Sequence, residues 1–257
     1  MRILKKKILL ALSLPVDFFK GKESFSYYPY SFLYFLIKFK KGSVRDAIGQ
    51  LVKSGEVDKI IRNNMSYFRL TGVGRERLLS LFPISVGQGQ VWDQRWRIII
   101  KNVKCQMSNV KLKEFGFKKL ARGVYITPMP ISEELKSYLL EENLLGGVVI
   151  VESRGLLTID NKDLAKKIWN LEELAKRYND FIKQCKRLLK RVVTKKRLKD
   201  REENEVVKLF DSYFFLLFGD PGLPKKVLLD DWPADFAREI FLDFFEQLRG
   251  GKLLDIF

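Results

Sequence analysis

The stretch that decides the fold of the first part of the chain is "SVRDAIGQLVKSGEVDKIIRNNMSYFRL", residues 43–70. Its first half repeats apolar side chains at helical spacing over residues 44–52, and a glycine follows as a typical helix stop. Ser43 with Asp46 three positions later predicts a capping-box start for this helix. The second half predicts two short strands about a turn at 63–64, where two asparagines tolerate a left-handed backbone. We therefore expect a helix followed by a β-hairpin.

A second helical pattern lies just before this stretch. In residues 29–42, "PYSFLYFLIKFKKG", large apolar side chains recur at positions 32, 35, 36 and 39, and a glycine ends the pattern. Two short helices joined by a glycine-containing turn make a helix-turn-helix, and the added hairpin makes it a winged helix. The opening run at 1–19 has the basic start and apolar core of a signal peptide, but it lacks a small-x-small cleavage site and contains Pro15. It is also too short to span a bilayer, so we predict that it forms the first helix of the fold.

The second helix of this pattern has a polar side that suits a major groove. Burial of its apolar stripe leaves Arg45, Gly49, Gln50 and Lys53 on the other side. Arginine pairs bidentately with guanine, glutamine pairs with adenine, and lysine contacts phosphate, while glycine permits close approach. A solvated polar face is the alternative, because every amphipathic helix needs one. The predicted DNA-binding residues are Ser43, Arg45, Gln50 and Lys53 in the helix, with Lys59, Arg62 and Arg69 in the wing.

The composition limits the chemistry that the chain can perform. Its 257 residues are 46% hydrophobic, which is enough for ordinary cores, but they include no histidine. The usual general base, zinc ligand and Ser-His or Cys-His arrangements are therefore excluded. Cys105 and Cys185 lie far apart, which fits neither a disulfide framework nor a cysteine metal site and indicates a reducing cytoplasm. No P-loop, dinucleotide-binding glycine motif or metal-ligand spacing is present, so we predict no catalytic residue, no metal, no cofactor and no enzyme activity.

The net charge of +17 is unevenly distributed along the chain. Residues 1–85 carry +10, residues 86–160 carry +3, residues 161–203 carry +8 and residues 204–257 carry −4. Clustered positive charge predicts a polyanionic partner. From Lys183 to Arg201, ten basic residues stand against one acidic residue. This run is either a solvated helix face, a second phosphate-contacting surface or the rim of an anion site, and RNA or a membrane surface are its alternative partners.

The middle of the chain predicts a ferredoxin-like domain. A glycine-containing linker at 84–94 is followed by strand, helix, strand, strand, helix and strand patterns that end near residue 153. This βαββαβ order is typical of the ferredoxin-like fold, which hosts many functions. Most of the remainder is predicted to be helical, in segments at 170–202, 203–218 and 234–249. We therefore expect an α+β protein with a winged-helix domain at 1–83, a ferredoxin-like domain at 84–160 and a helical regulatory domain at 161–257.

Four motifs occur in an order that is similar to that of one bacterial family. They are "VWDQRWRIII" (91–100), "GVYITP" (123–128), "WNLEELAKRYNDFI" (169–182) and "DPGLPKKVLLDDWPADFA" (220–237). Together they resemble the phenylacetate-degradation repressor (PaaX) family of transcriptional regulators, over nearly the whole chain. The resemblance implies a winged helix that binds operator DNA, a ferredoxin-like centre and a helical C-terminal domain. It also implies a homodimeric repressor that binds double-stranded DNA. A small-molecule effector such as an aryl-acyl coenzyme A thioester would release this repressor from the DNA. We expect no attachment to a membrane.

The central domain of this family also resembles the small CRISPR-associated endonuclease, which binds its metal through an aspartate at the end of the first strand. Here the matching position is Asn102, and a neutral amide is a poor substitute for the anionic oxygen that a hard cation prefers. The domain is therefore expected to be a scaffold for dimerisation or spacing. A metal-dependent nuclease that uses a central carboxylate such as Asp93 stays the alternative function.

The C-terminal motif is predicted to have structural roles. Where many family members carry a His-Glu-Tyr-Arg run, this chain reads Asp211-Ser212-Tyr213-Phe214, which replaces a cationic and a titratable side chain by an acid and a phenyl ring. Asp220 is expected to cap a turn, and Asp231 is expected to cap a helix that begins at Trp232. The candidate ligand-binding residues are Tyr213, Asp220 and Trp232, with a core position for the tryptophan as the alternative.

Overall fold

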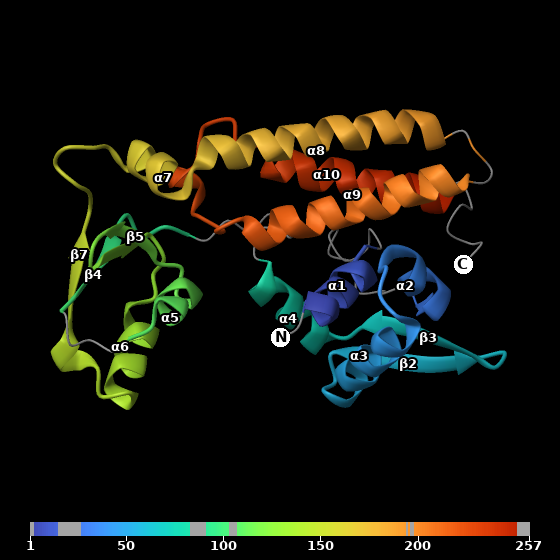
Figure 1. Ribbon diagram of the computed structural model, residues 1–257, viewed down its shortest axis with the longest axis horizontal. Helices are drawn as coiled ribbons and strands as arrows, with labels where there is room; N and C mark the ends of the chain where they lie inside the picture. Colours follow the sequence, from blue (N-terminus) through green and yellow to red (C-terminus); the bar gives the residue numbers. More distant parts are fainter. Residues whose placement is uncertain are drawn as a thin grey trace. The chain divides into compact units, whose positions relative to one another are not determined.

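The computed structural model describes residues 3–14, 27–82, 91–102, 107–193, 195 and 198–250. Two compact units make up the chain, and each is described by itself. The first contains Met1–Gln88, Lys176–Asp220 and Pro233–Phe257, and the second contains Gly89–Ala175 and Pro221–Trp232. Each unit combines one antiparallel sheet with helices, which confirms the predicted α+β class (Figure 1).

The N-terminal part of the first unit is a winged helix, as predicted. Its elements are α1 (Ile3–Leu12), β1 (Tyr28–Pro29), α2 (Tyr30–Leu36), α3 (Lys41–Lys53), β2 (Val57–Arg62), β3 (Met65–Leu70) and α4 (Gly72–Leu81). The strands form a sheet in the order β1-β3-β2. The hairpin turns at Asn63 and Asn64, whose φ angles of 48° and 59° are the left-handed values expected of this pair. Of the linker predicted at 84–94, only residues 91–94 belong to the described part of the chain.

Two helix ends in the winged helix differ from the prediction. α3 begins at Lys41, so Ser43 lies within the helix, and the capping box predicted from it is wrong. α2 ends at Leu36, and Ile37 is fully buried in an extended conformation. Phe39, which the helical spacing placed on the apolar stripe, is therefore 44% exposed. Burial of Ile37 in the core overrides the helical spacing here.

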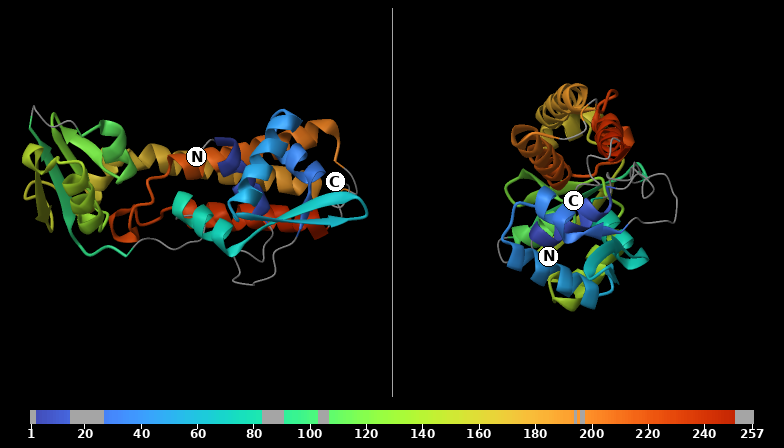
Figure 2. Two further views of the ribbon diagram at one scale, coloured as in Figure 1. Left: turned by 90° about the horizontal axis from the view of Figure 1, so that it is seen from below. Right: turned by 90° about the vertical axis from the view of Figure 1, so that its right-hand side faces the viewer.

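Three long helices complete the first unit. They are α8 (Leu171–Val192), α9 (Asp200–Gly219) and α10 (Ala234–Gly250), and the first residues of α8 belong to the second unit. They lie side by side, and α9 and α10 separate α8 from the winged helix (Figures 1 and 2). Aromatic rings from all three helices form their core. The Tyr213 ring stacks on Phe241 with centroids 3.9 Å apart and lies 5.4 Å from the Phe181 ring.

A partly buried ion pair joins the winged helix to α9. Lys7 of α1 is 6% exposed, and its Nζ lies 2.5 Å from Asp211 Oδ1 of α9. The same ammonium lies 5.9, 5.3 and 5.2 Å from the ring centroids of Phe39, Phe214 and Phe215. Ion pairing and cation–π attraction together offset the desolvation cost of burying this charge.

The second unit is built on a ferredoxin-like sheet, as predicted. Its elements are β4 (Trp96–Lys101), α5 (Asn109–Glu114), β5 (Lys118–Ala121), β6 (Val124–Thr127), α6 (Ser132–Glu141), a 3₁₀ turn (Leu145–Gly147) and β7 (Val148–Ser153). The strand order is β5-β6-β4-β7, and every pair is antiparallel. One face packs against α5 and α6 through a core that includes Ile99, Leu112, Phe117, Leu135 and Leu139.

The other face of this sheet is covered by two segments that the sequence did not assign to it. They are α7 (Asn161–Trp169), which the sequence did not predict, and the segment Pro221–Trp232 with its 3₁₀ turn at Lys225–Val227. Their apolar side chains form one core with the sheet, and it includes Trp92, Trp96, Ile126, Trp169, Leu223, Val227 and Leu228. The specific C-terminal motif thus contributes core residues to the ferredoxin-like unit. The domain boundaries at 83/84 and 160/161 stay predictions.

Two predicted helix caps are wrong in this region. Asn170, expected to start α8, instead ends α7 in a left-handed conformation with φ 52°, and its N–H donates to Lys166 O. Asp231 lies in a turn, because α10 begins only at Ala234. At Asn170 a helix thus ends where a start was predicted, and at Asp231 the helix starts later than predicted.

Candidate nucleic-acid interface

Helix α3 brings four of the predicted DNA-binding residues to one exposed side. It buries Val44, Ala47, Ile48 and Leu51, which point into the winged-helix core. The exposed residues on its other side include Ser43, Arg45, Gly49, Gln50 and Lys53. No Cβ added at Gly49 would meet a heavy atom within 4 Å, so the surface there is open.

Tyrosines of α2 position Arg45. Its Nε donates a hydrogen bond of 3.0 Å to Tyr34 Oη, and its guanidinium carbon lies 5.9 Å from the Tyr30 ring centroid. The two tyrosine rings stack with centroids 5.5 Å apart, and burial raises the pKa of Tyr30. Phenols are neutral at physiological pH, so they orient Arg45 without cancelling its charge. The sequence pattern did not identify these tyrosines as supports, because both lie on the preceding helix.

A second tyrosine-based cluster lies on the wing. Tyr27 Oη donates to Asp58 Oδ2 at 2.6 Å, and Arg69 contacts the same oxygen from Nε at 3.1 Å and from Nη2 at 3.0 Å. The guanidiniums of Arg69 and Arg62 lie 4.6 and 5.7 Å from the Tyr27 ring centroid. The hydrogen bond from Tyr27 and the nearby Arg69 lower the pKa of Asp58.

This cluster divides the predicted wing residues into two kinds. Asp58 and Arg69 face each other across the β2–β3 ladder, so Arg69 has a carboxylate partner. Lys59 and Arg62 are exposed on β2. Only these two present charge that no carboxylate of the described residues neutralises, whereas Arg69 also stabilises the hairpin.

The candidate ligand residues do not gather in one unit. Tyr213 and Asp220 belong to the first unit, where Tyr178 Oη donates to Asp220 Oδ2 at 2.7 Å. Tyr213 is 1% exposed, burial raises its pKa, and its hydroxyl has no hydrogen-bond partner among the described residues. Trp232 belongs to the second unit, where it packs against the tryptophan-rich core.

The residues considered for nuclease chemistry have structural partners. Asn102 Nδ2 donates to Gly146 O at 3.3 Å. Asp93 Oδ1 accepts from Arg97 Nη1 at 2.8 Å, and this bond lowers the pKa of the carboxyl. In the described part of the chain, no group of three or more Cys, Asp or Glu side chains could hold a metal ion. None of the described helices is both long and apolar enough to cross a membrane.

The described residues thus combine a winged helix, a ferredoxin-like sheet and a helical C-terminal region, which is the architecture that the resemblance of the motifs implies. Residues 169–252 match the family model described as PaaX-like protein C-terminal domain. The match over these residues supports the resemblance to the PaaX family noted in the motifs of the chain.

The fold also occurs in a solved structure, that of the uncharacterized protein Rv0674 from Mycobacterium tuberculosis. The similarity covers 96% of this chain and 97% of that one, with a TM-score of 0.54 and 17% sequence identity. At this identity the likeness concerns the fold alone. Among curated proteins, none matches the chain.

Proposed function

We propose that the protein is a sequence-specific DNA-binding repressor that places α3 in the major groove and the wing on the phosphate backbone. The observation that carries this proposal is the exposed side of α3, on which Arg45 is oriented by Tyr34. In this role Arg45 reads guanine, Gln50 reads adenine, and Lys53 contacts phosphate. Ser43 at the N-terminal part of the helix is a further base or phosphate contact.

On the wing, the proposal assigns Lys59 and Arg62 to phosphate contacts. Arg69 supports them by holding Asp58 and the Tyr27 ring in place. The regulator acts as a homodimer in the cytoplasm, since winged-helix dimers match two-fold half-sites on DNA. A small acyl-CoA-like effector releases it, and this part of the proposal rests on the PaaX-like C-terminal domain. Tyr213, Asp220 and Trp232 are its candidate ligand residues.

Fluorescence-anisotropy binding tests this function with two duplexes, the DNA upstream of the protein's own gene and a shuffled copy, across a salt series. We expect a preference for the native duplex that persists as salt rises, because base contacts are less salt-dependent than phosphate contacts. Arg45→Ala and Gln50→Ala should each cost about 1–3 kcal/mol on the native duplex.

Lys53→Ala should weaken binding to both duplexes equally. Lys113→Ala, which removes an exposed charge in the second unit, should leave the affinity for both duplexes unchanged. An equal loss on both duplexes for Arg45→Ala, Gln50→Ala and Lys53→Ala would contradict the assignment of α3 to the groove. Equal affinity of the unmodified protein for both duplexes would contradict sequence-specific binding to this DNA.

A further inference from the structure

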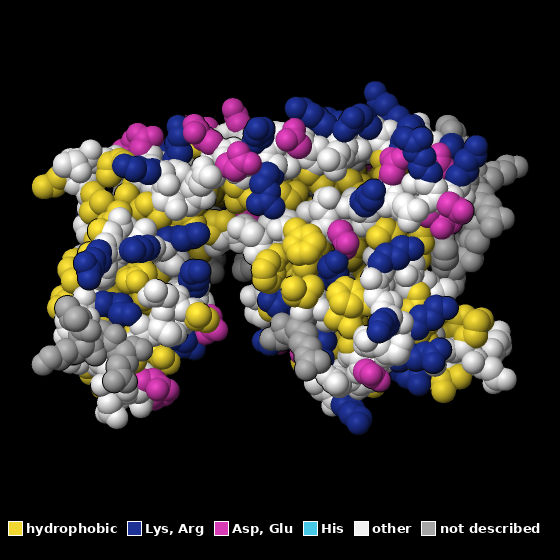
Figure 3. All heavy atoms as spheres, viewed as in Figure 1, with side chains coloured by type: hydrophobic (Ala, Val, Ile, Leu, Met, Phe, Trp, Pro, Cys, Tyr) yellow, Lys and Arg dark blue, Asp and Glu magenta, His cyan; other side chains and the backbone are white. Residues whose placement is uncertain are grey.

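A second cationic region of the first unit is a groove between α8 and α9 with a volume of about 650 Å³. Lys and Arg side chains gather over this part of the molecule (Figure 3). Among the described residues, the groove is lined by five cations and one carboxylate, Glu205. The cations are Arg187, Lys190, Arg191, Arg201 and Lys208. Because α9 and α10 separate α8 from the winged helix, this region is distinct from the proposed surface on α3 (Figures 1 and 2).

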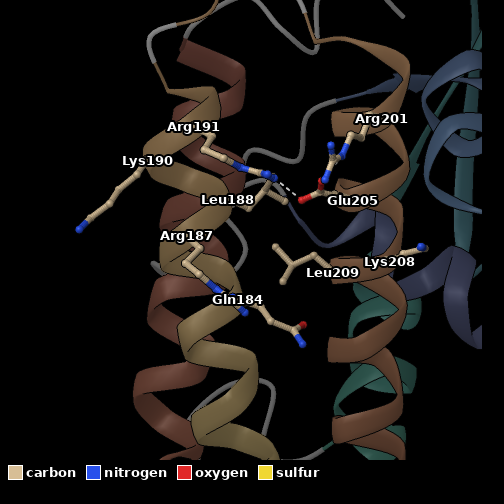
Figure 4. A pocket seen from close by; sticks show the side chains of 9 residues that line it. All are labelled: Gln184, Arg187, Leu188, Lys190, Arg191, Arg201, Glu205, Lys208 and Leu209. Carbon is tan, nitrogen blue, oxygen red and sulfur yellow. Dashed lines mark hydrogen bonds and ion pairs between the residues drawn. The ribbon is translucent and has the colours of Figure 1, made fainter.

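The single carboxylate does not satisfy the cations around it. Arg191 forms an ion pair with Glu205, and Arg201 Nε lies 3.5 Å from the other oxygen of the same carboxylate. Arg187 reaches into the groove beside Gln184, whereas Lys190 and Lys208 point away from its centre (Figure 4). Within the described residues, Arg187 has neither a hydrogen bond nor an ion pair. The groove therefore presents an exposed guanidinium that no carboxylate of the described residues neutralises.

The base of the groove is apolar. Leu188 and Leu209 line it and are 4% and 3% exposed. An apolar wall lowers the local dielectric constant and strengthens attraction between a guanidinium and an anion. The guanidinium fork also matches the oxygen geometry of phosphate, so two parallel hydrogen bonds can form.

We propose that the α8–α9 groove binds a phosphate-bearing small molecule through Arg187, with Arg191 and Arg201 contributing from the two helices. Cations from both helices line one concave site with an apolar base, which suits a compact anion better than an extended polymer. Gln184 supplies a further hydrogen-bond donor at the same site. This proposal stands on the groove itself and does not depend on DNA binding.

Pyrophosphate titration of the full chain by isothermal calorimetry tests this site. Arg187→Gln removes the uncompensated guanidinium. Lys183→Gln is the matched control, because Lys183 lies on the same helix, is 73% exposed and does not line the groove. We expect Arg187→Gln to weaken pyrophosphate binding about tenfold or more, as the loss of a charge-assisted bond implies, and Lys183→Gln to weaken it less than about twofold. Unchanged thermal unfolding of both variants shows that they are folded.

Three further results decide the proposal. ADP distinguishes an organic phosphate from the inorganic anion, and the proposal requires its binding to fall in Arg187→Gln as well. Equal losses in Arg187→Gln and Lys183→Gln would mean that only the net charge attracts the anion, which overturns it. The proposal is also overturned if a random DNA duplex displaces pyrophosphate and Arg187→Gln weakens binding of the duplex as much as it weakens binding of pyrophosphate. The groove would then contact nucleic-acid backbone.

Discussion

The winged helix and the α8–α9 groove are both cationic, but they hold their cations in different ways. On the winged helix, Arg45 and Arg62 lie against tyrosines, and among the predicted DNA-binding residues only Arg69 has a carboxylate partner in the described part of the chain. In the groove, Arg191 and Arg201 share Glu205, while Arg187 has no partner among the described residues. A phenol orients a cation and leaves its charge intact, whereas a carboxylate cancels much of it.

This difference predicts different partners for the two surfaces. Charges that are oriented but not neutralised, on an exposed helix and hairpin, suit a polymer that presents many phosphates in a row. Charges that converge on an apolar base with one unsatisfied guanidinium suit a single compact anion. Variants that damage one surface and spare the other therefore test the comparison.

The largest effect is expected from a change inside the winged helix. A Cβ at Gly74 of α4 would lie 1.9 Å from Glu56 O and 3.2 Å from Leu70 Cδ2. Since Glu56 O is backbone, the contact cannot be relieved by a rotamer change, and Gly74→Ala should cost about 3 kcal/mol or more. Urea denaturation measures this cost. Gly72→Ala is the control, because its Cβ would meet nothing within 4 Å. Equal stability of the two variants would contradict the close packing of Gly74 against the backbone of Glu56.

The next effect concerns the ion pair between Lys7 of α1, in the winged helix, and Asp211 of α9, which lines the groove with α8. Asp211→Asn leaves the Lys7 ammonium buried among aromatic rings without its carboxylate. Because the Asp211 side chain is 37% exposed, we expect a loss of about 2 kcal/mol, less than for a fully buried pair. Thermal unfolding of Asp230→Asn is the comparison, since its pair with Lys162 is exposed and should be worth at most about 0.5 kcal/mol. Equal effects would indicate that burial does not strengthen the Lys7 pair.

The sequence predicted the β2–β3 hairpin and the four strands of the second sheet for a clear reason, but it did not predict the short strand β1. The hairpin at 57–70 and the βαββαβ order depend on local patterns, namely strand alternation, a paired-asparagine turn and glycine stops. Segments placed by long-range packing were not predicted. Residues 221–232 pair no strand and show no periodicity, and only the buried positions of Leu223 and Val227 reveal that they belong to the ferredoxin-like unit.

Helix α7, which was not predicted, has a local start signal in the sequence. Asp160 Oδ1 accepts hydrogen bonds from the backbone N–H groups of Lys162 and Asp163, which is an N-cap that the sequence displays. Asn170 then ends the helix with a positive φ, a role that asparagine shares with glycine. The pattern instead placed Asn170 at the start of the next helix, because asparagine is also a common N-cap residue.

At the candidate interface, the sequence predicted which residues are exposed on α3 but not what supports them. Amphipathic spacing fixes the side on which Arg45, Gln50 and Lys53 lie. Tyr34 and Tyr27 come from segments before the pattern, so only the folded chain brings them to Arg45 and Asp58.

A smaller effect should follow from removing the support of Arg45. Tyr34→Phe deletes the hydroxyl that accepts the Arg45 hydrogen bond but keeps the ring that stacks on Tyr30. We expect it to weaken binding to the native duplex by about 0.5–1.5 kcal/mol, less than Arg45→Ala, and to leave pyrophosphate binding unchanged. Anisotropy and calorimetry on the same preparation measure both. A loss of pyrophosphate affinity would break the proposed separation of the two surfaces.

The smallest effect concerns Asp58, the one carboxylate in the tyrosine cluster of the wing. The bond from Tyr27 and the pairing with Arg69 hold its folded pKa below that of the unfolded chain. Its stabilising contribution is therefore fully present above the unfolded value of about 4 and is lost as the pH falls through the folded value. The free energy of unfolding of Asp58→Asn should thus lie below that of the unmodified protein at pH 7, by less than about 1 kcal/mol, and the difference should shrink below pH 4.

Tyr27→Phe tests the cause of this pH dependence. Because the hydrogen bond from Tyr27 contributes most to the lowered pKa, its removal should raise the pKa of Asp58 toward the ordinary value, and Arg69 alone should hold the carboxylate. NMR titration of the Asp58 carboxyl carbon measures this shift directly. An unchanged titration midpoint in Tyr27→Phe would assign the stabilisation of the carboxylate to Arg69. The wing would then resemble the groove, where guanidiniums and a carboxylate hold each other, and the contrast between the two cationic surfaces would reduce to Arg45 and its tyrosines.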